Sequence, residues 1–214
     1  ANKKWFPLAH QYRRIWGNLI CFLAGLRKKV TFEEPLDTNR VYIIAPNHCS
    51  YLDIVSTTCD IPIYFNYVAK YELSKIPLFG RFFKTIDIAV NRKNRKQAVQ
   101  SFHDADARIK EGTSILVFPE GAITDESPIL SRFKSGAFKL AIQNQIPILP
   151  VTILDNYKRL PNGNLFSGSP GKMRMIVHRP IEVTNLKLED EAELKQKVYS
   201  IIEKALLDHK VYSL

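Results

Sequence analysis

Cysteine, long apolar runs and a nucleophilic-serine motif are all scarce or missing in this sequence, and each scarcity excludes something. The 214 residues include three cysteines, an odd number with no CxxC pair, which favours reduced thiols in the cytoplasm over a disulfide framework. The longest apolar run near the N-terminus, residues 19–26, is too short to span a bilayer. No GxSxG sequence occurs, which argues against a nucleophilic serine on a strand–helix turn.

Acidic residues are missing from the first 32 positions, although the formal net charge of the whole chain is +10. Such a charge predicts an anionic partner, which can be nucleic acid, acidic lipid or a phosphorylated substrate. The basic residues of this stretch are Lys3, Lys4, Arg13, Arg14, Arg27, Lys28 and Lys29. They alternate with aromatic residues and leucines, a mixture typical of helices at an anionic membrane surface. No helix-turn-helix, RNP-like or zinc-finger spacing favours nucleic acid.

The length predicts one domain with a full hydrophobic core, preceded by the basic segment. We expect residues 1–30 to form an amphipathic membrane-interacting helical segment and residues 31–214 to form an α/β domain. The sequence begins with Ala1 and not with methionine, which is compatible with the prior removal of an upstream segment, even a transmembrane helix. No cleavable signal peptide is evident.

Short apolar runs alternate with segments of helical periodicity along the whole chain. Strands are predicted at 41–45, 64–69, 86–90, 115–118, 148–152 and 173–178, with helices at 6–26, 53–59, 93–110, 133–144 and 190–208. A first strand and loop are expected at 31–40, a broken helix at 72–83 and an exposed loop at 156–170. This alternation predicts a layered α/β fold with a largely parallel sheet flanked by helices.

The predicted helix at 6–26 has two interpretations. Its apolar positions recur at three- and four-residue steps: Leu8, Tyr12, Ile15, Leu19, Leu23 and Leu26. A stripe of this kind ordinarily packs against a core, whereas the one-sided charge favours a helix lying on a membrane surface. Periodicity alone does not choose between them.

Polar residues follow four predicted strands, where the ligand sites of parallel sheets gather. These residues are His48, Lys70, Arg92 and Glu120. A helical turn after His48 would bring Asp53 to its imidazole, and an imidazole oriented by a carboxylate is a general base near neutral pH. The alternatives are a structural histidine, solvated surface charges for the two cations, and a turn-stabilising role for Glu120.

Four blocks together make the sequence resemble the 1-acylglycerol-3-phosphate acyltransferases, a glycerolipid acyltransferase family. The blocks are Asn47-His48-xxxx-Asp53, residues 80–92 (GRFFKTIDIAVNR), Phe118-Pro119-Glu120-Gly121 and residues 146–150 (IPILP). Their order and spacing match the family from about residue 41 to residue 151. Together with the third and fourth blocks, the first is a specific signal.

The resemblance implies the roles of several residues. His48 would be the catalytic base and Asp53 its orienting partner. Substrate binding would fall to Asn47, Ser50, Lys70, Arg92, Glu120, Gly121 and Lys134. The implied reaction moves an acyl chain from a thioester, on coenzyme A or acyl carrier protein, to lysophosphatidic acid, giving phosphatidic acid for phospholipid synthesis. It implies a peripheral or monotopic enzyme at the cytoplasmic face of the cell membrane, without bound cofactor, metal or nucleic acid.

One departure from the family concerns the acceptor. Members commonly continue FPEG with Thr-Arg, whereas this chain continues with Ala122-Ile123-Thr124, so an arginine that can hold the acceptor phosphate is missing. Arg132 or Lys134 can supply that charge instead. Another lysophospholipid or a lyso-aminolipid is therefore an alternative acceptor. A non-enzymatic basic module that binds membranes or nucleic acid is the alternative of another class.

The residues also predict how the acyl group would move. Without a serine elbow, we expect direct transfer with no covalent acyl-enzyme. Cys49 lies inside the motif, but adjacent residues usually point apart, so we interpret it as a spacer. Backbone amides near the Glu120–Gly121 turn would stabilise the oxyanion. A metal held by His48, Asp53 and Glu120 is a weak alternative, because the spacing matches no known zinc pattern.

Overall fold

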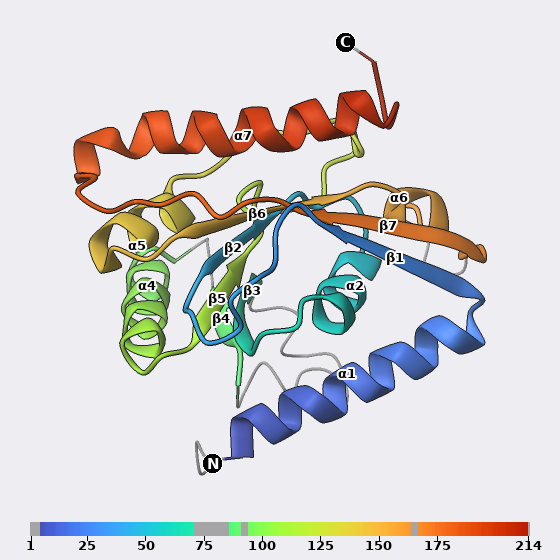
Figure 1. Cartoon of the computed structure of the whole chain (residues 1–214), viewed down its shortest axis with the longest axis horizontal. Coiled ribbons are helices and arrows are strands. Elements are labelled where there is room, and N and C mark those ends of the chain that lie inside the picture. The colour runs from blue at the N-terminus through green and yellow to red at the C-terminus, as the bar shows by residue number, and fades with distance from the viewer. Residues whose placement is uncertain (1–4, 71–85, 91–93, 164–166, 214) are drawn as a thin grey trace.

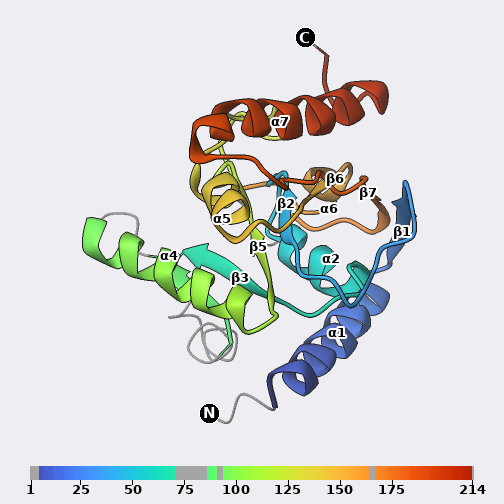
Figure 2. The same cartoon turned by 60° about the vertical axis from the view of Figure 1, so that its left-hand side comes forward.

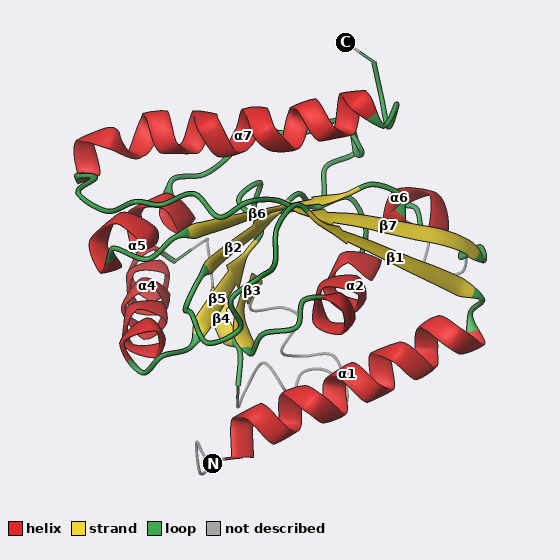
Figure 3. Cartoon of the chain, viewed as in Figure 1, coloured by secondary structure: helices red, strands yellow, loops and turns green. Residues whose placement is uncertain are grey.

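The computed structural model describes residues 5–70, 86–90, 94–163 and 167–213, which form a layered α/β structure (Figures 1 and 3). Its strands are β1 (Leu26–Phe32), β2 (Ile43–Pro46), β3 (Phe65–Lys70), β4 (Ile88–Val90), β5 (Ser114–Val117), β6 (Ile148–Ile153) and β7 (Gly171–Val177). Its helices are α1 (Phe6–Leu23), α2 (Leu52–Asp60), α4 (Arg95–Lys110), α5 (Gly136–Asn144), α6 (Asn156–Arg159) and α7 (Glu191–Asp208), with a 3₁₀ turn, η3 (Leu188–Asp190).

The strands join in the order β1-β7-β6-β2-β5-β3-β4. Among the described strands, neighbours run parallel except β6 and β7, which pair antiparallel. The predicted class, a largely parallel sheet flanked by helices, is confirmed. β2 lies between β5 and β6 at the centre of the sheet. The segment that follows β2 therefore lies at the carboxyl ends of the central parallel strands.

The central strands are buried on both faces, which explains why they are apolar runs and do not alternate with polar residues. Ile43 packs into the cluster formed with α4, α5 and α7, and its neighbour Ile44 packs into the cluster formed with α2. Figure 2 shows these helices on opposite sides of the sheet. α1 contacts α2 and β1 and lies outside the α2 layer.

Two helix boundaries follow from local chemistry. The side chain of Asn94 accepts hydrogen bonds from the backbone N–H groups of Lys96 and Gln97, which caps the start of α4. After α4 the chain turns at Gly112, whose φ of +83° favours glycine and suits the end of a helix.

Two expectations about local structure need correction, and a third concerns residues outside those that the structure describes. The first helix ends at Leu23, not at residue 26, because Gly25 with φ +66° turns the chain into β1, and the boundary expected at residue 30 falls inside that strand. The expected exposed loop at 156–170 begins instead with α6 and a buried Asn156. The broken helix expected at 72–83 and most of the 80–92 block lie outside the described residues.

α1 is oriented with its apolar stripe toward solvent. Its exposed large side chains, with that of the preceding Trp5, are Trp5, Leu8, Tyr12, Ile15, Trp16, Leu19, Phe22 and Leu23. Its buried side includes His10 and Arg13, and Arg13 forms an ion pair of 2.9 Å with Asp87 just before β4. The core-packing interpretation of this stripe is therefore wrong. Among the described residues, no helix has both the length and the apolar character needed to cross a membrane.

Candidate active site

The site forms where β2 ends at the centre of the sheet. Pro46 closes the strand, residues 47–51 form a loop, and α2 begins at Leu52. The carboxylate of Asp53, in the first turn of α2, accepts hydrogen bonds from the backbone N–H groups of Cys49 (2.6 Å) and Ser50 (2.8 Å). A carboxylate at a helix N-terminus is favoured by the unpaired N–H groups and the helix dipole, so this loop folds around Asp53.

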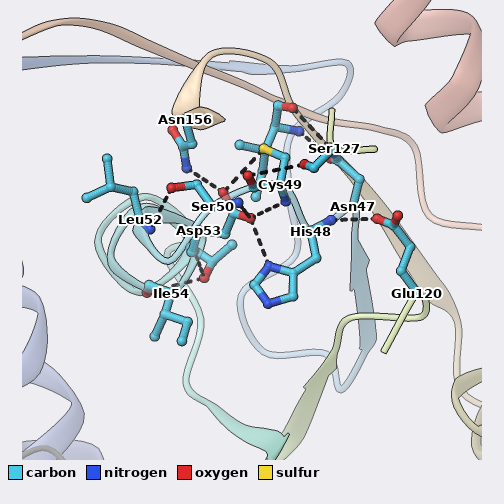
Figure 4. A network of polar contacts seen from close by, with 12 residues as sticks. Asn47, His48, Cys49, Ser50, Leu52, Asp53, Ile54, Glu120, Ser127 and Asn156 are labelled. Atoms are coloured by element: carbon cyan, nitrogen blue, oxygen red, sulfur yellow. Dashed lines mark hydrogen bonds and ion pairs between the residues drawn. The ribbon is translucent and has the colours of Figure 1, made fainter. Parts of the chain in front are cut away.

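His48 meets the same carboxylate. Its Nδ1 lies 2.9 Å from Asp53 Oδ2 (Figure 4). Because a carboxylate accepts hydrogen bonds, this contact places the proton on Nδ1 and leaves Nε2 with the lone pair that can take a proton from a substrate. The imidazole stacks on Phe118, with ring centroids 4.0 Å apart and planes 16° from parallel. The ring is thereby fixed in both position and tautomer.

Asp53 is fully buried, and all of its polar atoms have partners within the protein. Oδ2 accepts from His48, Cys49 and Ser50, and Oδ1 accepts from the side-chain amide of Asn156 at 2.8 Å. Charged groups are buried only when they are paired or hydrogen-bonded. Four donors therefore surround this carboxylate, and one of them is the imidazole of His48.

Glu120, expected in the acceptor site, instead joins two loops behind His48. Its Oε1 accepts from the backbone N–H of His48 at 2.7 Å, and its Oε2 accepts from the N–H and Oγ of Ser131 at 2.9 and 2.8 Å. Burial raises the pKa of this carboxyl, and the bonds from Ser131 and His48 partly offset that effect. Both oxygens are engaged by protein groups, so in this geometry Glu120 supports the backbone of His48, and its place in the acceptor site stays a prediction.

Asn47 and Ser50 also hold the scaffold. The amide of Asn47 donates to the carbonyl of Ile153 (3.1 Å) and accepts from its N–H (2.7 Å), which fastens the end of β2 to the end of β6. Ser50 Oγ donates to the carbonyl of Leu160 (2.7 Å) and accepts from the N–H of Leu52 (3.1 Å). Both side chains are therefore engaged within the protein, and their contact with substrate stays a prediction.

The remaining predicted site residues are spread around the motif. Gly121 has φ +86°, and its N–H donates to the Phe118 carbonyl at 3.0 Å, so this amide is engaged within the turn; an oxyanion role for backbone amides near the turn stays a prediction. Lys134 is exposed, and its backbone N–H donates to the Pro119 carbonyl. Lys70 ends β3, but its side chain lies outside the described residues, as does all of Arg92.

Cys49 is placed as a buried spacer. Its Sγ lies 3.7 Å from Asp53 Oδ1, and Ser127 Oγ donates to its carbonyl at 3.2 Å. Burial, and then the negative charge of Asp53, raises the pKa of the Cys49 thiol well above its usual value. Because the thiolate is the nucleophilic form, this environment disfavours a covalent route through Cys49.

Sequence reasoning missed Asn156 and Ser131, the partners of the two buried carboxylates. Asn156 could have been found, since it stands three residues after the last residue of β6 and the same strand-end rule applies to it. The composition of 156–170, rich in Gly, Pro and Asn, instead indicated an exposed loop. Among the described residues, no group of three or more His, Cys, Asp or Glu side chains is arranged to hold a metal ion.

A layered, mostly parallel sheet with a His–Asp pair at the ends of its central strands defines an α/β enzyme. The family model described as "Acyltransferase" matches residues 27–154, which contain the pair, Glu120 and β2 to β6. The chain belongs to the acyltransferase family.

Individual relatives agree with this assignment, and one solved structure shares the fold. An uncharacterized acyltransferase of Schizosaccharomyces pombe is 30% identical over 210 residues, covering 95% of this chain and 74% of that protein. A probable 1-acyl-sn-glycerol-3-phosphate acyltransferase of Mycoplasma pneumoniae is 28% identical over 213 residues, covering 91% and 77%. The crystal structure of the lysophosphatidic acid acyltransferase PlsC from Thermotoga maritima has a similar fold, with a TM-score of 0.83, 23% identity and coverage of 100% and 85%.

Proposed function

We propose that this acyltransferase moves a fatty acyl chain from an acyl thioester to the free hydroxyl of lysophosphatidic acid. The observation that carries the proposal is the 2.9 Å contact between His48 Nδ1 and a fully buried Asp53 carboxylate. The names of the relatives from Mycoplasma and from Saccharomyces cerevisiae, both 1-acyl-sn-glycerol-3-phosphate acyltransferases, support this acceptor. The donor is a thioester of coenzyme A or of acyl carrier protein.

In the proposed mechanism, Nε2 of His48 takes the proton of the acceptor hydroxyl as its oxygen attacks the thioester carbonyl. The tetrahedral intermediate collapses, the C–S bond breaks, and the imidazolium returns the proton to the departing thiolate. Asp53 keeps the proton on Nδ1 and stabilises the imidazolium, as the acid does in a Ser-His-Asp triad. General-base action is worth roughly 10²–10⁴-fold in rate. No acyl-enzyme forms in this scheme, which the buried, weakly acidic Cys49 supports.

We propose further that the protein works as a peripheral or monotopic enzyme at the cytoplasmic face of the membrane. The support is α1 with the preceding Trp5, whose exposed face together carries two tryptophans, a tyrosine, a phenylalanine and aliphatic side chains. Contiguous exposed apolar surface of this kind is characteristic of a lipid- or protein-binding face. Arg27 and Lys29, both exposed on β1 next to the end of α1, suit an anionic surface.

The test of the reaction measures free-thiol release from acyl-coenzyme A, and then from acyl carrier protein thioester, with and without lysophosphatidic acid. The wild type should release thiol only when both substrates are present. His48→Ala should lose at least about 10²-fold in kcat while keeping its fold by circular dichroism. Near wild-type turnover in a folded His48→Ala protein would exclude the general-base mechanism.

Two further variants separate the roles inside the motif. Asp53→Asn should lower kcat strongly, because an amide at this position can no longer favour the productive tautomer. Cys49→Ala should turn over at close to the wild-type rate. A folded but inactive Cys49→Ala protein would instead favour a covalent thiol route.

A second acceptor class is favoured by the loop that follows Glu120. This loop carries Ala122 and Ile123 where the family commonly has Thr-Arg, and it lines a cavity of about 200 Å³ beside Cys49. The described lining residues are Cys49, Thr124, Asp125, Ser127, Tyr157, Pro161 and Asn162. His48 is not among them, so this alternative rests on the missing Thr-Arg after FPEG. Faster turnover on a zwitterionic lysophospholipid or a lyso-aminolipid than on lysophosphatidic acid would establish this alternative.

A further inference from the structure

We propose that Asn156 is a positioning residue for the His48–Asp53 pair, and that its side-chain amide sets the pH range in which His48 can act as a base. The inference rests on the proposed function, because it concerns the proton that His48 is proposed to take. Asn156 lies on the far side of the Asp53 carboxylate from the imidazole (Figure 4).

The geometry gives the amide a defined task. Its Nδ2 donates to Asp53 Oδ1 at 2.8 Å and to Ser56 Oγ at 2.9 Å, and the side chain is buried. Oδ2 of Asp53 is already engaged by the loop and by His48. Asn156 therefore supplies the strongest contact to the second oxygen, since the only other group near it is the Cys49 thiol at 3.7 Å among the described residues.

The orientation of the amide is dictated by Asp53. A carboxylate only accepts hydrogen bonds, so the flipped amide would place its oxygen against a negative charge. In the orientation that faces Nδ2 to Asp53, the buried Oδ1 of Asn156 has no hydrogen-bond partner within the described part of the chain. Leaving one buried acceptor unpaired costs free energy, which shows that the contact with Asp53 outweighs it.

Asn156 is held in place from behind. The preceding Asp155 forms two hydrogen bonds with the guanidinium of Arg174 on β7, at 2.6 and 2.7 Å. Partial burial raises the pKa of Asp155, but the hydrogen bonds and charge of Arg174 lower it overall, so it is ionised and paired. At the other end of α6, Leu160 accepts the hydrogen bond of Ser50. This short helix therefore docks on the catalytic loop as a fixed element.

The other described titratable groups around the pair do not replace Asn156. Cys49 remains a neutral thiol because its pKa is raised by burial, and Glu120 faces the backbone of His48. Asp155 is neutralised by Arg174. The form of the pair that can take a proton has a neutral imidazole beside an ionised Asp53. Removing the Asn156 donor destabilises this form more than the form in which an imidazolium compensates the carboxylate.

The test compares Asn156→Leu, which keeps the approximate volume but removes the donor, with the wild type. The acid limb of the pH profile of kcat/KM should move to higher pH by about one unit. At pH values well below the wild-type midpoint kcat should fall by up to about tenfold, and by less at neutral pH, with KM for both substrates changed less than about twofold. The midpoint of the His48 imidazole titration, followed by NMR without substrate, should move in the same direction.

Two more variants keep the test decisive. Asn156→Asp, which puts a second carboxyl against Asp53, should move the His48 midpoint upward as well and covers the case in which Asn156→Leu does not fold. Ser169→Ala removes a hydrogen bond to the Lys158 carbonyl of α6 and should leave the midpoint and kcat unchanged.

The inference is overturned if folded Asn156 variants lose activity equally at every pH, or if the His48 midpoint stays where it is in the wild type. A wild type that consumes no thioester would refute the proposed function. The NMR titration would still decide whether Asn156 controls the protonation of His48.

Discussion

α1 and α7 are both 18-residue helices with an apolar stripe, yet α7 buries its apolar side whereas α1 leaves its apolar side exposed. α7 places Leu194, Val198, Ile202 and Leu206 in the main core. α1 instead leaves its aromatic and aliphatic side chains in solvent and packs a polar side, with His10 and Arg13, against the protein. Amphipathicity therefore shows that a segment is helical, but it does not show whether the apolar stripe faces the protein core or the outside of the molecule.

The polar inner side of α1 is built as a paired network. The Arg13 guanidinium donates to Asp87 and contacts His10 Nδ1 at 2.8 Å, and it lies 5.0 Å from the Tyr67 ring centroid. Burial, and then the charges of Arg13 and Arg14, lowers the pKa of His10 to about 3, so this imidazole is neutral at physiological pH. A helix that packs such groups against the protein leaves its apolar side available to contact lipid.

The largest expected effect is a charge placed on the buried stripe of α7. Val198→Asp should lower the free energy of unfolding by about 4 kcal/mol or more, because it buries a carboxylate with no partner and loses the valine's packing. The matched change on α1, Ile15→Asp, should cost less than about 0.5 kcal/mol, since Ile15 is 64% exposed. Urea unfolding without lipid measures both. Similar losses in the two variants would show that the α1 stripe is already covered in solution, for instance by a second copy.

Next in size is the loss of the buried cation on the inner side of α1. Arg13→Met leaves Asp87 buried without its partner and should cost about 3–5 kcal/mol. Burial raises the pKa of Asp87, and the charge of Arg13 partly offsets this rise, so removing Arg13 raises the pKa further. The folded variant then holds a proton that the unfolded chain releases above pH ~3.9. Its stability deficit should therefore grow as the pH rises, and Arg13→Met combined with Asp87→Asn should remove that dependence.

The same two helices show how far the sequence predicts this molecule. Both were predicted as helices from their periodicity, and the strand runs with their terminal polar residues predicted the layered fold and the meeting of His48 with Asp53. The orientation of α1 could not be predicted from local sequence. Arg13 pairs with Asp87, which lies 74 positions away, and the contact of Arg13 with His10 is buried only because α1 packs with this side against the protein. The strand-end rule could have indicated Asn156 as a site residue, but not that its partner is Asp53, which lies 103 positions away in the sequence.

A third expected effect concerns the outer stripe and the membrane. Phe22 and Leu23 are 80% and 75% exposed at the end of α1. Phe22→Ser or Leu23→Ser should each weaken binding to lipid vesicles about tenfold, about 1.4 kcal/mol, because an apolar side chain no longer leaves water on binding. The unfolding free energy should stay within about 0.5 kcal/mol of the wild type. Val99→Ser, at a half-exposed apolar position on α4, is the control that should not change vesicle binding.

The smallest expected effect compares two exposed basic residues of β1 with the internally paired one between them. Arg27 and Lys29 are exposed on β1, whereas Lys28 between them forms an ion pair of 2.7 Å with Asp60. Arg27→Gln or Lys29→Gln should weaken binding to anionic vesicles about fivefold, since a basic residue near such a surface contributes about 1 kcal/mol. Lys28→Gln should weaken it less, because Asp60 already balances that charge. High salt should remove the difference, and zwitterionic vesicles should not show it. An equal loss for all three variants would mean that net charge alone, and not the orientation of β1 beside α1, determines the electrostatic part of membrane binding.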